Sequence, residues 1–181
     1  MVPSLSDQYS KALEAYKRAL VLNPNNPEIF RLLAELEAAN GDYNAARQYA
    51  IQAIVKKTNY SAAYLTTALI EVSRGNIEEG IKILESAVRI IPSEMTLVYQ
   101  LGLLYRDSGQ YAKAVDALSY LLTQIPEHSD ARFSLALVYE KQGRVSAALK
   151  ELREVLKHNP NNQIILDVIR RLENSTKTSS K

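Results

Sequence analysis

Residue types that commonly carry out chemistry are few in this chain of 181 residues, and their spacing does not suit it. Neither of the two histidines, His128 and His158, has the second histidine four residues away that a helical metal site needs. The adjacent Glu78 and Glu79 would point in different directions on a helix, so they make a poor acid and base pair. The sequence has no cysteine and no glycine-rich phosphate loop. We therefore expect no enzyme activity, no catalytic residue, no cofactor and no metal site.

The composition is that of an ordinary folded chain with a mixed surface. Hydrophobic residues make up 46%, charged residues 23%, and the net charge is +2, so no strong field indicates nucleic acid or an anionic membrane. No apolar run approaches the roughly 18 residues of a membrane span. The start of the chain, MVPSLSDQYS, lacks the apolar core of a signal peptide. We expect no nucleic-acid partner and no direct membrane insertion, and the compartment stays open with the cytoplasm as the default.

Single glycines recur with a period of 34 residues, which is typical of a repeat protein. They stand at Gly41, Gly75, Gly109 and Gly143. Prolines follow the same period at Pro24, Pro92, Pro126 and Pro160, with Thr58 in the one vacant place. Each period has about thirteen helix-forming residues, the glycine turn, about fifteen more and the proline turn, which predicts a helical hairpin. Small residues such as Ala34 and Ala46 would let the two helices of a hairpin approach closely.

These residues resemble the tetratricopeptide repeat family over about residues 7 to 173. The best match is TLVYQLGLLYRDSGQYAKAVDALSYLLTQIPEH, which has the family's signature residues Leu101, Gly102, Tyr105, Gly109, Tyr111, Ala114, Leu118 and Pro126. Thr67, Gly80, Thr58 and Arg132 depart from the family pattern. The resemblance implies an all-α fold, an α-α superhelix of four full hairpins with an N-terminal half repeat and a C-terminal capping helix.

The period divides the chain into one solenoid domain over residues 1–173. The half repeat is expected at 7–22, the full hairpins at 27–57, 61–91, 95–125 and 129–158, and the capping helix at 161–173. The polar residues 174–181 are expected to form a flexible tail. Because the first helix lacks the first half of its hairpin, we expect either a longer parent chain or self-association through this uncovered helix.

In the family, the first helix of each hairpin lines the inner wall where ligands usually lie. One face of these helices predicts a peptide-binding groove at Arg31, Glu35, Leu65, Leu69, Tyr99, Leu103, Arg106, Phe133, Leu137 and Glu140. Tyr99 and Phe133 would offer rigid contact area on successive hairpins. The leucines could equally pack one first helix against the next. The branch of the family that clamps chaperone carboxylates is disfavoured, since only Arg31 resembles one of its basic residues.

The family resemblance implies a non-enzymatic protein-interaction module with a protein or peptide ligand. The alternative is a structural spacer or a regulatory tail of a larger protein. A weaker resemblance, carried by LVYQLGLLYRDSGQYAKAVDAL, is to the repeat tails of bacterial O-antigen ligase-like membrane proteins. In that case the parent would be a membrane-bound glycan ligase or polymerase, and this part would only recruit or orient.

Overall fold

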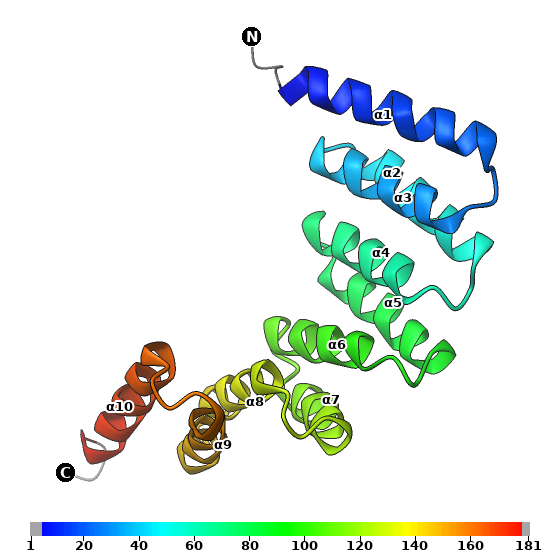
Figure 1. Ribbon diagram of the computed structural model, residues 1–181. Helices are drawn as coiled ribbons and strands as arrows, with labels where there is room; N and C mark the ends of the chain where they lie inside the picture. Colours follow the sequence, from blue (N-terminus) through cyan, green and yellow to red (C-terminus); the bar gives the residue numbers. More distant parts are fainter. Residues whose placement is uncertain (1–4, 179–181) are drawn as a thin grey trace. The chain divides into compact units, whose positions relative to one another are not determined.

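The computed structural model describes the backbone of residues 5–178 and the side chains of residues 7–175. In this range the chain forms ten α-helices and no strand (Figure 1). They are α1 (Leu5–Leu22), α2 (Pro27–Ala39), α3 (Tyr43–Lys56), α4 (Ser61–Ser73), α5 (Ile77–Ile90), α6 (Met95–Asp107), α7 (Tyr111–Gln124), α8 (Ser129–Lys141), α9 (Val145–His158) and α10 (Gln163–Thr178). The chain is therefore an all-α solenoid of helical hairpins, as the sequence predicted.

The helices gather in two compact units, Met1–Leu97 and Val98–Lys181. In the first unit α2 packs on α1, α3 and α4, and α4 packs on α3 and α5. In the second unit α8 packs on α7 and α9, and α10 packs on α9. Each helix thus buries its apolar face against helices that lie close to it in sequence, which is the packing of a repeat protein.

A glycine with positive φ closes the first helix of every full hairpin, as the period predicted. The φ angles are +87° at Gly41, +84° at Gly75, +78° at Gly109 and +71° at Gly143. At the second of these turns the amide of Asn76 donates to the carbonyl of Glu71 at 2.8 Å, and Gly75 donates to Val72 at 2.9 Å. This arrangement satisfies carbonyls that the end of a helix leaves open, and only glycine adopts its backbone conformation without strain.

Small residues let the helices of a hairpin approach closely. Ala34 on α2 and Ala46 on α3 are fully buried in one cluster with Ala50 and Ile70. In the second unit, a Cβ added to Gly102 on α6 would lie 2.9 Å from the Leu118 side chain of α7. The predicted close approach of paired helices is therefore confirmed.

Two polar residues that depart from the family pattern have hydrogen-bond partners close by. Thr67 is buried on α4, where a leucine is usual, and its hydroxyl donates to the carbonyl of Ala63 at 2.7 Å. Arg132, in a place where a large apolar residue is common, donates to Glu151 on α9 at 2.9 Å and to the carbonyl of Pro126 at 3.0 and 3.2 Å. Both polar side chains are thus paired inside the hairpins that hold them.

The last helix covers the end of the second unit. Ile165, Ile169 and Leu172 of α10 are buried against Leu152 and Val155 of α9 and their neighbours. The helix continues to Thr178, so the predicted end at 173 and the flexible tail at 174–181 differ from the structure. Once a helix is nucleated, each further residue adds a hydrogen bond, and a polar sequence can therefore extend it. Residues 179–181 of the expected tail lie outside the described residues.

The first helix begins at Leu5 and is covered in part by α2. The hydroxyl of Tyr9 donates to the carboxylate of Glu37 on α2 at 2.7 Å, and Leu20 packs against the cluster that contains Phe30. Part of the apolar face of the half repeat is therefore packed on the first full hairpin. Self-association through this helix stays a prediction.

Candidate functional site

The charged part of the predicted groove is internally paired in the first unit. Arg31 forms ion pairs with Glu28 and Glu35, and its Nε also donates to the hydroxyl of Tyr60 at 3.0 Å. Glu35 accepts a further hydrogen bond from Thr66 at 3.1 Å. The hydrogen bond from Arg31 lowers the pKa of Glu28, and that hydrogen bond in turn raises the pKa of Arg31. Arg31 and Glu35 thus link α2 to α4, because Thr66 belongs to α4 and Tyr60 directly precedes it.

An apolar hollow lies on the same face of the first unit. Leu65 is half-buried, whereas Leu69 on α4 exposes 55% of its surface. The hollow has a volume of about 150 Å³. It is lined by Glu35 and Ala38 of α2 and by Thr66, Leu69, Ile70 and Ser73 of α4. The structure thus brings two of the predicted groove residues, Glu35 and Leu69, around one small space between neighbouring first helices.

In the second unit, Tyr99 is held by a ring contact that the sequence did not reveal. Its ring centroid lies 4.9 Å from that of His128, with 38° between the ring planes. The Nδ1 atom of His128 accepts a hydrogen bond from the amide of Ala131 at 3.2 Å and so caps α8. The half-buried Tyr99 of α6 is therefore fixed against the start of the next first helix.

The remaining predicted groove residues of the second unit differ in how far they are already packed or paired within the chain. Leu103 and Leu137 are half-buried, and Phe133 packs against the cluster that joins α9 to α10. Arg106 donates to Asp107 at 2.7 Å. Glu140 accepts from Arg171 of α10 at 3.0 Å, so the capping helix already provides its charge partner.

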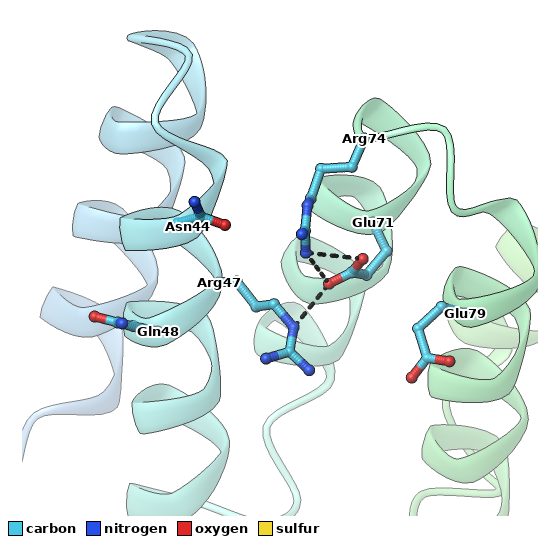
Figure 2. A pocket seen from close by; sticks show the side chains of 6 residues that line it. All are labelled: Asn44, Arg47, Gln48, Glu71, Arg74 and Glu79. Carbon is cyan, nitrogen blue, oxygen red and sulfur yellow. Dashed lines mark hydrogen bonds and ion pairs between the residues drawn. The ribbon is translucent and has the colours of Figure 1, made fainter.

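A polar cavity on the first unit was missed by the reading of the sequence. It has a volume of about 590 Å³ and lies between α3, the end of α4 and the start of α5 (Figure 2). Its lining residues are Asn44, Arg47, Gln48, Glu71, Arg74 and Glu79. None of them belongs to the predicted groove.

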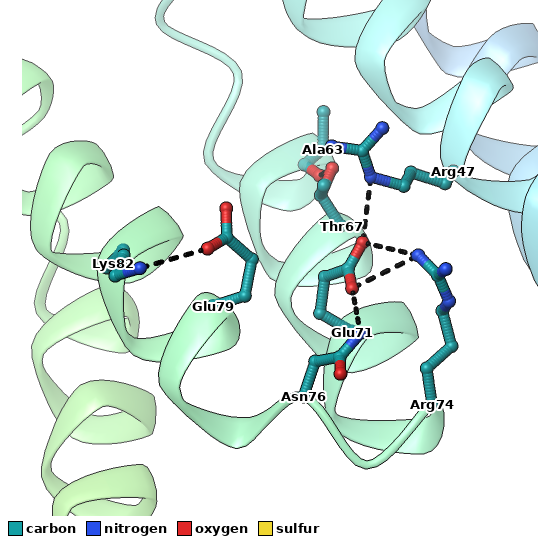
Figure 3. A network of polar contacts seen from close by, with 8 residues as sticks. All are labelled: Arg47, Ala63, Thr67, Glu71, Arg74, Asn76, Glu79 and Lys82. Atoms are coloured by element: carbon teal, nitrogen blue, oxygen red, sulfur yellow. Dashed lines mark hydrogen bonds and ion pairs between the residues drawn. The ribbon is translucent and has the colours of Figure 1, made fainter.

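A buried carboxylate organises this cavity (Figure 3). Glu71 exposes only 2% of its surface. Its carboxylate accepts from Arg47 Nε at 2.8 Å, from Arg74 Nη1 at 3.1 and 3.2 Å, and from Asn76 Nδ2 at 2.9 Å. Burial alone would raise the pKa of Glu71, but the hydrogen bond from Asn76 and the two guanidinium groups outweigh it and lower the pKa. The group is therefore held ionised inside the protein.

The 34-residue period contains a signal that could have found Glu71. The place that Tyr105 and Tyr139 occupy in the third and fourth hairpins is taken by Glu37 and Glu71 in the first two. Both glutamates are buried, and both have partners, since Glu37 receives the hydroxyl of Tyr9 at 2.7 Å. A charged residue at a place that the repeat reserves for the core predicts a buried polar network.

The described residues hold neither a metal cluster nor a membrane-spanning helix. Within the part of the chain whose placement is described, no group of three or more histidine, cysteine, aspartate or glutamate residues could hold a metal ion. No helix among those residues is both long enough and apolar enough to cross a membrane.

Comparison with protein families gives two matches to tetratricopeptide repeat models. One, described as a tetratricopeptide repeat, matches residues 99–163, and the other, described as a TPR repeat, matches residues 6–41. Together they account for more than half of the chain and include parts of both compact units.

A curated protein is also similar to part of this chain. The chain is 28% identical over 119 residues to the BBSome complex member BBS4 of Bos taurus, and this match takes in 66% of the chain but only 23% of that relative. The chain therefore spans less than a quarter of the length of this curated relative.

Two solved structures have the same fold. The C-terminal part of a TPR repeat-containing protein from Cytophaga hutchinsonii superposes with a TM-score of 0.80 at 18% identity, over 96% of this chain and 69% of that one. YrrB, a TPR protein with an unusual peptide-binding site, superposes with a TM-score of 0.71 at 17% identity, over 91% of this chain and 85% of that one. At these identities the likeness is one of fold. These relatives give no support to the weaker resemblance to O-antigen ligase-like proteins.

Proposed function

This chain belongs to the tetratricopeptide repeat family, and from that premise we propose that it is a non-enzymatic scaffold that binds a peptide or helical segment of a partner protein along its first helices. The fold supports protein or peptide partners in general. The peptide-binding site of YrrB is a precedent for such a ligand on this fold. The groove residues named above are the proposed contacts.

The main support for this proposal is the exposed Leu69 in its apolar hollow. Surface leucines are common, but this one lies in a concavity between the first helices of two hairpins. A partner side chain that filled the hollow would remove Leu69 from water, which contributes about 1.5 to 3 kcal/mol per buried apolar side chain. Arg31 and Glu35 already neutralise each other beside it, so we expect an apolar rather than a charged anchor.

The second unit offers a matching kind of surface. Tyr99, Leu103 and Leu137 are half-buried, so each keeps part of its apolar surface accessible. The ring contact with His128 already restricts the side chain of Tyr99. Tyr99 therefore loses less conformational entropy when a partner binds. With two or three such anchors, a micromolar dissociation constant is a reasonable order of magnitude once association costs are deducted.

The test is a pull-down from source-cell lysate, with the membrane fraction included, followed by calorimetry with the partner segment that is identified. We expect Leu69→Glu to weaken binding at least about tenfold, because a carboxylate in the hollow would have to be desolvated. Leu103→Glu should weaken binding in the same way. Leu69 is the cleaner position, since its exposure makes a folding defect less of a concern.

The matched control is Val55→Glu on α3, which introduces the same charge at a residue with 63% exposure outside the groove. It should bind as the unaltered chain does. Equal binding by the unaltered chain and all three variants would refute the groove, and retention of no partner by the unaltered chain would favour a spacer instead.

A further inference from the structure

The polar cavity between α3, α4 and α5 has the features of a built site. One of its charged groups, Glu71, is almost completely buried and holds two guanidinium groups at its carboxylate (Figures 2 and 3). Its volume of about 590 Å³ is within the range of ordinary ligand pockets. Nothing in the proposed groove function uses this cavity.

The arginines have donors to spare. Arg47 uses its Nε atom for Glu71, and no other hydrogen bond of its guanidinium is formed among the described residues. Arg74 reaches Glu71 through Nη1 alone. Each guanidinium group has five N–H donors, so both retain donors for a further acceptor.

The charges of the cavity leave room for one more anion. Arg47 and Arg74 carry two positive charges, and Glu71 supplies one negative charge between them. Glu79, the other acidic residue of the lining, is paired with Lys82 at 3.4 Å. A ligand carboxylate would therefore meet one uncompensated positive charge that a buried group holds in position.

The amide side chains of the lining indicate what the anion is attached to. Asn44 lies three residues before Arg47 and so shares a helix face with it, and Gln48 lines the cavity four residues after Asn44, beside it on α3. Amide side chains both donate and accept hydrogen bonds, as the peptide groups of an extended chain require. An inorganic anion would need donors only.

From this arrangement we propose that the cavity binds an acidic peptide segment, with an aspartate or glutamate carboxylate on the free edge of Arg47 and the neighbouring peptide groups on Asn44 and Gln48. Glu71 acts as a positioning residue that aligns the two guanidinium groups and does not touch the ligand. Glu79, although paired with Lys82, still places a like charge near the ligand and so weakens its binding. The contact is separate from the first-helix groove and does not depend on it.

The experiment is a nuclear magnetic resonance titration of the full chain with the blocked pentapeptide acetyl-Ala-Ala-Glu-Ala-Ala-amide. The glutamine analogue of this peptide is the matched control ligand. We expect the glutamate peptide to cause saturable shifts of the Arg47 Nε–H signal and of the Asn44 and Gln48 side-chain amides. The glutamine peptide should leave those signals in place, because a neutral amide gains little from a guanidinium group.

Three variants make the titration specific. Arg47→Gln should lower the affinity at least about tenfold, since it removes a charge-assisted hydrogen bond. Glu79→Gln should raise the affinity by a factor of roughly two to five, because it removes an exposed like charge. Arg89→Gln on α5, outside the cavity, should bind as the unaltered chain does.

Several results would overturn the proposal. They are equal shifts with the two peptides, an unchanged affinity in Arg47→Gln, and a loss in Arg89→Gln as large as in Arg47→Gln. Stronger shifts with inorganic phosphate than with the peptide at equal concentration would overturn the assignment to a peptide. If Arg47→Gln does not fold, the comparison of the two peptides on Glu79→Gln still decides. Leu69→Glu tests the groove alone, so a failure of one site is distinguishable from a failure of the other.

Discussion

The carboxylate of Glu71 makes the stability of the chain depend on pH in a defined direction. Its pKa in the folded state lies below the ordinary value, because Asn76 and two arginines stabilise the charged form despite burial. A carboxyl group with a lowered folded pKa stabilises the fold above its unfolded pKa of about 4.3, and this contribution is lost as the pH falls through the lower folded value.

We therefore expect Glu71→Gln to destabilise the chain at pH 7 by roughly 2 kcal/mol, since two guanidinium groups lose their shared partner. The difference from the unaltered chain should shrink when both are acidified below pH 4. Urea unfolding at a series of pH values measures it. Glu79→Gln is the control, because Glu79 is half-exposed and its ion pair with Lys82 is a surface pair that should change stability little. A deficit that stays constant with pH would contradict this role of Glu71.

Single residues were the hardest level to predict from the sequence. Arg31 lies on a first helix as predicted, and its partners Glu28 and Glu35 stand at ordinary helical ion-pair spacing, but its hydrogen bond to Tyr60 could not be assigned from spacing. The pairing of Glu140 with Arg171 joins residues 31 apart and depends on how α10 packs. Side-chain partners follow from tertiary geometry, which the period of a repeat does not specify.

Helix α10 has one face that packs against the protein and one that faces water. Shortening a side chain to alanine should therefore affect stability differently on the two faces. Leu172→Ala removes a side chain with 3% exposure, and we expect it to cost about 2 to 5 kcal/mol of unfolding free energy. Ile164→Ala, on the same helix at 69% exposure, should stay within about 0.5 kcal/mol of the unaltered chain. Thermal and denaturant unfolding of both variants measures the contrast. Equal losses would mean that α10 does not pack as described.

Helices were predicted far better than side-chain contacts, because their limits have local causes. The glycines at 41, 75, 109 and 143 mark a backbone conformation that other residues avoid, and each closes a helix where it was expected. The end of α10 was predicted less well, since residues 174–178 have no apolar pattern and carry no stop signal. A helix can continue there on backbone hydrogen bonds that leave no mark in the sequence.

The contacts between helices are local within each unit, which predicts how disturbances spread. Among the described residues of the first unit, α2 meets α1, α3 and α4, and in the second unit α9 meets α8 and α10. In such an array, stability is a sum of hairpin and nearest-neighbour terms. We expect Leu172→Ala to speed amide hydrogen exchange in α9 and α10 and to leave α2 and α3 unchanged. Faster exchange throughout the chain would instead indicate one cooperative unit.

The buried glutamates of the first two hairpins limit the ways in which this repeat can be rearranged. Hairpins that share a backbone period look interchangeable, so gene duplication and recombination could place them in any order. Glu37 and Glu71, however, depend on Tyr9 and on Arg47, which come from the hairpin or half hairpin before them. A shuffled copy of the first full hairpin would leave Glu37 without its Tyr9 donor. A shuffled second hairpin would lose the Arg47 bond to Glu71 but keep those from Arg74 and Asn76. We therefore expect the first two full hairpins to tolerate reordering less well than the hairpins that carry tyrosine at this place.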